Sequence, residues 1–99
     1  MTEYDDFVSV DLMDELRDNL LMGGLGLTGE AGEVADDIKK FIFHKKGTIG
    51  DFRIRMLEEL GDQHWYWTLL RLVLDFSQEE IEDYNMCKLR ARYPERHPE

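Results

Sequence analysis

The chain has 99 residues, of which 42% are hydrophobic and 34% charged, and this composition fits one globular domain over residues 1–99 and excludes a disordered chain. Its net charge of -10 argues against a general nucleic-acid binder and against docking on anionic lipid, since both need basic surfaces. Acidic excess keeps a small protein soluble, but it also suits a polyanionic substrate when divalent cations lie between carboxylates and phosphates.

Hydrophobic spacing predicts four helices. Proline interrupts none of them, because the only prolines, Pro94 and Pro98, lie in the last six residues. The first helix is expected over residues 9–22, and Gly23 and Gly24 would end it. The second is expected over residues 28–44, with an apolar stripe roughly 120° wide. The members of this stripe are Ala31, Val34, Ala35, Ile38, Phe41 and Ile42.

The third helix is expected over residues 52–76, with a cap at Asp51. Beyond Asp62 it is apolar on two opposite sides, so we expect the side with Leu69 to contact another subunit. The fourth is expected over residues 77–92, because the segment SQEE from Ser77 matches a capping box. Four helices with short loops predict an all-α helical bundle, and a chain this short is expected to assemble into a homodimer or homotetramer.

Cysteine content and the N-terminal segment bear on the compartment. Cys87 is the single cysteine, which excludes a disulfide within the chain and favours a reducing environment. The segment MTEYDDFVSV lacks the basic and apolar parts of a secretory signal, and no apolar run approaches the ~20 residues of a membrane span. We therefore expect a cytoplasmic protein without membrane contact.

Two pairs of carboxylates repeat one spacing. Glu30 and Glu33 lie three residues apart in the second predicted helix, and Glu59 and Asp62 repeat this in the third. Each pair borders the apolar stripe of its helix, so the four carboxylates converge if the helices pack by these stripes. Clustered carboxylates need compensation, and oxygen ligands favour Mg²⁺, with Mn²⁺ as a substitute. The alternative is four ordinary surface residues in a Glu-rich chain.

Three segments in order, GLTGEAGEVADDIKK, EELGD and WYW, resemble the MazG-type nucleotide pyrophosphohydrolases of the all-α NTP pyrophosphatase superfamily. The signature of that superfamily is ExxE, a spacer and ExxD, and here 25 residues, positions 34 to 58, separate Glu33 from Glu59. The final segment NMCKLRARYP is similar to the closing NxxKLRxRYP segment of the family. The resemblance covers about residues 20–94.

The resemblance implies an enzyme that hydrolyses a (deoxy)nucleoside triphosphate between the α and β phosphates, giving the monophosphate and pyrophosphate. It implies that Glu30, Glu33, Glu59 and Asp62 bind Mg²⁺, which would neutralise phosphate charge and lower the pKa of an attacking water. Glu33 and Glu59 are the candidate catalytic residues, and Glu33 is favoured as the proton acceptor.

Five further residues are candidates for substrate binding. Asn85, Lys88 and Arg92 share one face of the fourth helix, where they would hold sugar and phosphates unless this is only a polar exterior. Tyr66, the aromatic residue nearest the carboxylates on the helical wheel, would stack on the base, although aromatic residues in bundles are more often core. Asn19 would read a base edge through its amide.

Three other interpretations stay open. A phosphoribosyl-ATP pyrophosphohydrolase of the same superfamily would cut the same kind of bond. A non-catalytic helical interaction module would keep the shape, and a simple metal-binding protein would keep the carboxylates. The presence of all four carboxylates disfavours an inactive relative.

Overall fold

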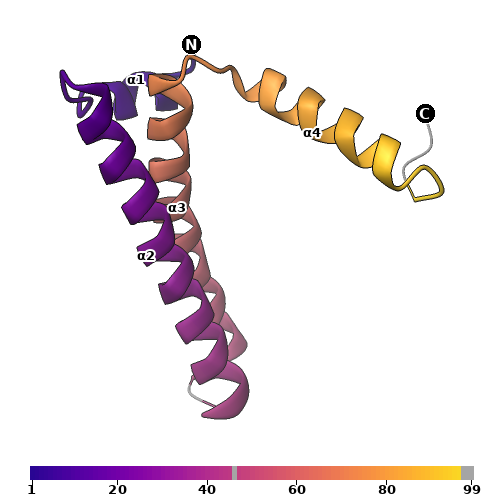
Figure 1. Ribbon diagram of the computed structural model, residues 1–99. Coiled ribbons are helices and arrows are strands. Elements are labelled where there is room, and N and C mark those ends of the chain that lie inside the picture. The colour runs from indigo at the N-terminus through magenta and orange to yellow at the C-terminus, as the bar shows by residue number, and fades with distance from the viewer. Residues whose placement is uncertain (46, 97–99) are drawn as a thin grey trace.

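The computed structural model describes residues 1–45 and 47–96, and these residues form four α-helices and no strand. The helices are α1 (Glu3–Ser9), α2 (Leu16–Phe43), α3 (Ile49–Val73) and α4 (Gln78–Arg92). α2 and α3 form a long hairpin, α1 lies at its open end against α3, and α4 projects away from it (Figure 1). The all-α prediction is confirmed, but the helices do not close into a four-helix bundle within the described chain.

Capping boxes begin three of the four helices. The hydroxyl groups of Thr2, Thr48 and Ser77 each accept a hydrogen bond from the backbone amide three residues further on. The acidic side chain at that third position accepts a bond from the cap amide in return. The capping box predicted at Ser77 is confirmed. The third helix begins after Thr48 rather than at the predicted cap Asp51, whose carboxylate is the reciprocal acceptor of that box.

The main correction to the predicted elements concerns Gly23 and Gly24, which lie inside a helix of 28 residues rather than at its end. The predicted boundaries 9–22 and 28–44 are therefore wrong, because Ser9 ends α1 and one continuous helix runs from Leu16 to Phe43. Each interior glycine disfavours a helix by roughly 1 kcal/mol relative to alanine. Packing against α3 outweighs this local preference in α2.

Two glycines of α2 allow α3 to approach closely. A Cβ added at Gly23 would lie 2.5 Å from Cδ2 of Leu70, and one added at Gly26 would lie 2.3 Å from ring carbons of Tyr66. Real side chains essentially never approach a Cβ so closely, so a larger residue at either position would require Leu70 or Tyr66 to move or the helices to separate. The close contact between α2 and α3 therefore depends on Gly23 and Gly26, which have no side chain in the way.

The apolar stripe predicted for the second helix faces α3 only in part. Val34 and Phe41 are half-buried, and the ring of Phe41 packs on Phe52 with centroids 4.4 Å apart. The remaining members are exposed, and these are Ala31, Ala35, Ile38 and Ile42. The expectation that the helices pack by their stripes therefore holds only at one edge of the stripe, because the side of α2 with Gly26 and Glu30 also lies against α3.

The core is small and centres on α3. Among the described residues, Val8 and Leu69 are the fully buried apolar side chains. The prediction that Leu69 lies on a subunit-facing side is thus wrong, because α2 covers it within the chain near Gly23. None of the helices in the described part of the chain combines the length and apolar character that a membrane span needs.

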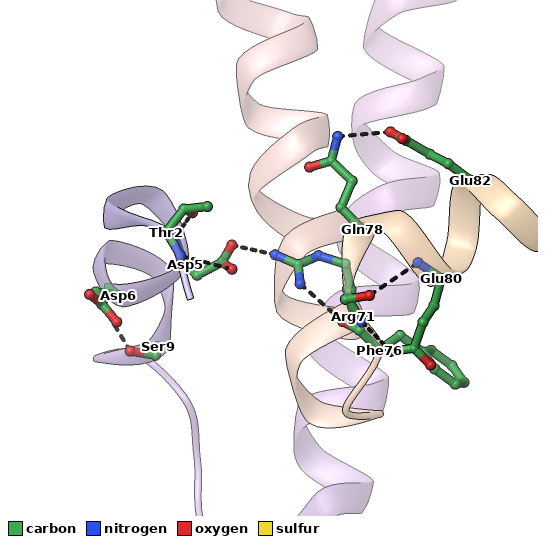
Figure 2. Close-up of polar contacts among 10 residues, drawn as sticks. Thr2, Asp5, Asp6, Ser9, Arg71, Phe76, Gln78, Glu80 and Glu82 are labelled. Atoms are coloured by element: carbon green, nitrogen blue, oxygen red, sulfur yellow. Dashed lines mark hydrogen bonds and ion pairs between the residues drawn. The ribbon is translucent and has the colours of Figure 1, made fainter.

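A buried ion pair fastens α1 to α3. The guanidinium of Arg71 donates to Asp5 and also to the carbonyl oxygen of Phe76, at 3.0 Å (Figure 2). Burial opposes the ionisation of Asp5, but the amide of Thr2 and the charge of Arg71 outweigh it and hold the pKa of Asp5 below its ordinary value. One side chain thus joins α1, α3 and the turn that leads into α4.

Gly26→Ala should destabilise the protein, because the new methyl group would overlap the ring of Tyr66. We expect a loss of about 1–3 kcal/mol in the free energy of unfolding. Gly24→Ala is the matched control, since a Cβ there meets no atom of the described residues within 4 Å, and it should stabilise α2 by up to about 1 kcal/mol. Thermal unfolding followed by circular dichroism measures both. Equal Tm values for the two variants would refute the close approach.

Candidate metal centre

Carboxylates from α2 and α3 meet in the middle of the hairpin. One carboxylate oxygen from each of Glu30, Glu33 and Glu59 lies within 4.8 Å of the other two. Glu30 and Glu33 are about one turn apart in α2, and Glu59 approaches them from α3. The structure thus brings together three of the four residues that the sequence suggests as metal ligands.

Asp62 lies beside this group, one turn after Glu59. It is exposed, and it lines a hollow of about 430 Å³ with Glu30, Trp65 and Tyr66. Its oxygens do not belong to the group of three that lie within 4.8 Å of one another. Asp62 therefore borders the carboxylate group on the side of the hollow.

The electrostatics of the group depend on its partial burial. One oxygen of Glu30 and one of Glu59 are buried and have no hydrogen-bond partner among the described residues. Loss of solvation, followed by the neighbouring carboxyl groups of Glu33 and Glu30 and the charge of Asp37, raises the pKa of Glu59 to about 7. A divalent cation would supply the missing positive charge and engage these oxygens. The residues therefore fit a hard cation such as Mg²⁺ or Mn²⁺.

Tyr66 lies close to the carboxylates, as the helical wheel suggests. It packs over Gly26, which precedes Glu30 by about one turn, and it lines the same hollow as Glu30 and Asp62. The missing side chain at Gly26 is what lets the ring lie between the helices. Tyr66 thus gives this hollow an aromatic surface beside the carboxylates.

The three predicted phosphate-binding residues of α4 lie elsewhere. Asn85, Lys88 and Arg92 are exposed on a helix that projects from the hairpin, so they do not meet the carboxylates within the described chain (Figure 1). Asn85 lines a separate hollow of about 460 Å³. The other lining residues of that hollow are Phe76, Glu80, Ile81 and Tyr84.

Asn19 has a local role in the structure. Its side chain is 4% exposed, its Nδ2 donates to the carbonyl of Met13, and its Oδ1 accepts from the amide of Met13, both at 2.9 Å. These two bonds fix the turn between α1 and α2 and occupy both ends of the amide. We therefore leave Asn19 out of the proposed site.

Another acidic residue, Asp37, lies close to this group on α2. Its Oδ2 is buried without a hydrogen-bond partner in the described part of the chain. Asp37 follows Glu30 by seven positions and Glu33 by four, so helical spacing alone puts it on their side of α2. The ExxE motif does not include it.

Comparison with known proteins gives a family-level match. The profile of the MazG nucleotide pyrophosphohydrolase domain matches residues 18–97, which include most of α2 and all of α3 and α4 but not α1. Among curated proteins, the chain is similar to the Gene 37 protein of Mycobacterium phage L5, with 39% identity over 69 residues. The matched segment is 69% of this chain and 60% of that relative, so the chain spans less than two thirds of the relative's length. No solved structure matches.

The raised pKa of Glu59 predicts a pH dependence of stability in the metal-free protein. Because the pKa is about 7 in the fold against 4.5 ordinarily, the protonated carboxyl stabilises the fold at low pH, and this contribution is lost as pH rises through 7. Glu59→Gln mimics the protonated form. Its Tm in EDTA should therefore exceed that of the wild type by more at pH 8 than at pH 5.

Added Mg²⁺ should raise the Tm of the wild type, more at pH 8 than at pH 5, because the cation binds ionised carboxylates. It should have little effect on Glu59→Gln. Glu58→Gln, a change at the exposed neighbour, is the control and should follow the wild type. A Tm difference between Glu59→Gln and wild type that is independent of pH and of Mg²⁺ would refute this account of the site.

Proposed function

Because the chain belongs to the MazG nucleotide pyrophosphohydrolase family, we propose that it hydrolyses a (deoxy)nucleoside triphosphate between the α and β phosphates. The products are the (deoxy)nucleoside monophosphate and pyrophosphate. The observation that carries the proposal is the approach of Glu30, Glu33 and Glu59 within 4.8 Å between α2 and α3. Family membership supports nucleotide pyrophosphohydrolase chemistry in general, and the carboxylate group supplies a place for it in this chain.

Members of this family generally depend on a divalent metal, and we propose Mg²⁺ here, with Mn²⁺ as a substitute. Glu30, Glu33, Glu59 and Asp62 would hold it. When bound, this cation supplies positive charge for the phosphates and acidity for an attacking water. The unpartnered buried oxygens of Glu30 and Glu59 support this assignment.

We assign proton transfer to Glu33. It is the exposed member of the three close carboxylates, so it can accept a proton from a water that arrives from solvent. Glu59 is half-buried and its pKa is raised, so its ionisation accompanies cation binding. The two glutamates thus differ in role because their exposure differs.

We place the base in the hollow beside the carboxylates. Tyr66 and Trp65 supply aromatic surface there, and Glu30 and Asp62 border it. This arrangement puts a stacked base on one side of the carboxylates and leaves the triphosphate to extend along them. In this proposal the phosphates also contact cationic side chains of α4.

A second copy of the chain supplies them in our proposal, as part of a homodimer or homotetramer. Lys88 and Arg92 stand exposed on α4, away from the carboxylates of their own chain. The hairpin also exposes large apolar side chains, including Leu57 at 76% and Ile42 at 59%. Exposed apolar side chains of this size become interaction surface where they gather into a patch. We infer that copies pack by these faces and bring α4 of one chain toward the carboxylates of another.

Incubation with each common NTP and dNTP plus Mg²⁺ should yield monophosphate and pyrophosphate, resolved by ion-exchange chromatography. Glu59→Gln should lower kcat on the order of 100-fold or more, because it removes a metal ligand. Glu58→Gln is the matched control and should keep wild-type turnover, since that side chain is exposed outside the group of three. Circular dichroism checks that both variants are folded.

Other products would contradict the proposal in distinct ways. Diphosphate plus phosphate would mean a different cut. Turnover of phosphoribosyl-ATP alone would favour that substrate class. A folded, Mg²⁺-replete protein with no turnover would favour the non-catalytic interaction module, and full activity of Glu59→Gln would refute the site assignment.

The proposed assembly predicts a change of mass on disrupting the exposed stripe of α2. Ile42→Glu should shift the protein toward the monomer in size-exclusion chromatography with light scattering, because a buried unpaired carboxylate opposes association. Lys39→Glu, an exposed change on the same helix outside the stripe, is the control and should leave the mass unchanged. A wild-type protein that is monomeric at micromolar concentration would contradict the assembly.

A further inference from the structure

α2 carries a third acidic residue along the line of Glu30 and Glu33. Asp37 follows them by seven and four positions, so the three side chains lie along one side of the helix. The same side continues to Phe41, whose ring packs on Phe52 of α3 with centroids 4.4 Å apart. Asp37 therefore lies between the carboxylate group and this aromatic contact, in the seam where α2 meets α3.

The environment of Asp37 differs from that of its neighbour. Asp36 has a side chain that is 47% exposed, and its carboxylate pairs with Lys40 at 2.8 Å and with Lys39 at 3.9 Å. Asp37 is half-buried, and its Oδ2 is buried with no hydrogen-bond partner in the described residues. A buried anionic oxygen is costly unless a cation or a donor meets it. Asp36 has such a partner, whereas Asp37 presents an unpaired oxygen.

The charge of Asp37 also acts on the carboxylate group. It is one of the causes that raise the pKa of Glu59, after burial and the two nearer glutamates. The seam therefore holds three buried carboxylate oxygens without partners among the described residues, one each from Glu30, Glu59 and Asp37. Their common need is positive charge, and carboxylate oxygens in such number are what hard divalent cations bind.

We propose that Asp37 belongs to the divalent-cation site as a fifth carboxylate, which extends the site along α2 toward Phe41 and strengthens its hold on the cation. The inference rests on the proposed function, because it takes Glu30, Glu33 and Glu59 as ligands. It goes beyond the two carboxylate pairs of the family signature, since Asp37 belongs to neither pair.

A structural role is the competing explanation for Asp37. Lys40 lies nearby, and its pKa is raised mainly by its bond to Asp36, with a smaller contribution from the charge of Asp37 and an opposing one from Arg55. If Asp37 served only to balance Lys40 and Arg55, its loss would change the stability of the metal-free protein and leave cation affinity alone. Metal affinity measured without nucleotide separates the two roles.

The test is Mn²⁺ binding by isothermal titration calorimetry, with free Mn²⁺ followed by electron paramagnetic resonance, on the full chain without nucleotide. Asp37→Asn should weaken Mn²⁺ binding about tenfold or more. Asp36→Asn is the matched control, an adjacent residue with the same change, and should bind Mn²⁺ as the wild type does because an exposed ion pair contributes little. Glu59→Gln, which removes a proposed ligand, should lose binding.

The outcomes separate this inference from the proposed function. If Asp37→Asn binds Mn²⁺ like the wild type while Glu59→Gln does not, Asp37 is no part of the site and the proposed function stands. If the wild type binds no Mn²⁺, or Glu59→Gln binds it unchanged, the metal site of the proposed function is wrong as well. A lowered Tm of metal-free Asp37→Asn with unchanged Mn²⁺ affinity would assign Asp37 to Lys40 and Arg55 and overturn the inference.

Discussion

The distance between α2 and α3 is set by Gly23 and Gly26, and the rest of the site depends on that distance. Any Cβ at these positions would overlap Leu70 or Tyr66 of α3. Because the helices are so close there, the next turns of α2 bring Glu30 and Glu33 against Glu59, within 4.8 Å. The close approach of the helices therefore brings like-charged carboxylates together a few residues further along α2. The raised pKa of Glu59 and the buried carboxylate oxygens without partners follow from this crowding.

The carboxylates between α2 and α3 account for part of the net charge of -10. Part of the acidic excess is concentrated in one seam, where the carboxylates repel one another unless a cation is present. A cation held among these carboxylates would also attract phosphate, because its positive charge interacts with carboxylate and phosphate oxygens alike. The family to which the chain belongs is that of the MazG nucleotide pyrophosphohydrolases. In the function proposed above, a cation held in this seam would let so acidic a chain bind a polyanion.

Features with local causes could be predicted from the sequence. The helical class followed from spacing and the absence of early prolines, and the box at Ser77 is a four-residue pattern. The carboxylate pairs were visible as i, i+3 repeats. The continuity of α2 through Gly23 was not predictable in this way, because its cause is the side chain of Leu70 on another helix. The two hydrogen bonds between Asn19 and Met13 were likewise not predictable, because they depend on the conformation of the turn that joins α1 to α2.

The bond between Asp5 and Arg71 joins residues 66 positions apart, and this separation has a consequence for the order of folding. The α2–α3 hairpin closes through a short connection, so its contacts form at small entropic cost, whereas docking of α1 on α3 before the hairpin forms would close a far longer loop. During synthesis, α1 leaves the ribosome long before Arg71 does, and Val8 stays exposed until α3 exists. We therefore expect α1, the first helix in the sequence, to dock only after the α2–α3 hairpin has formed.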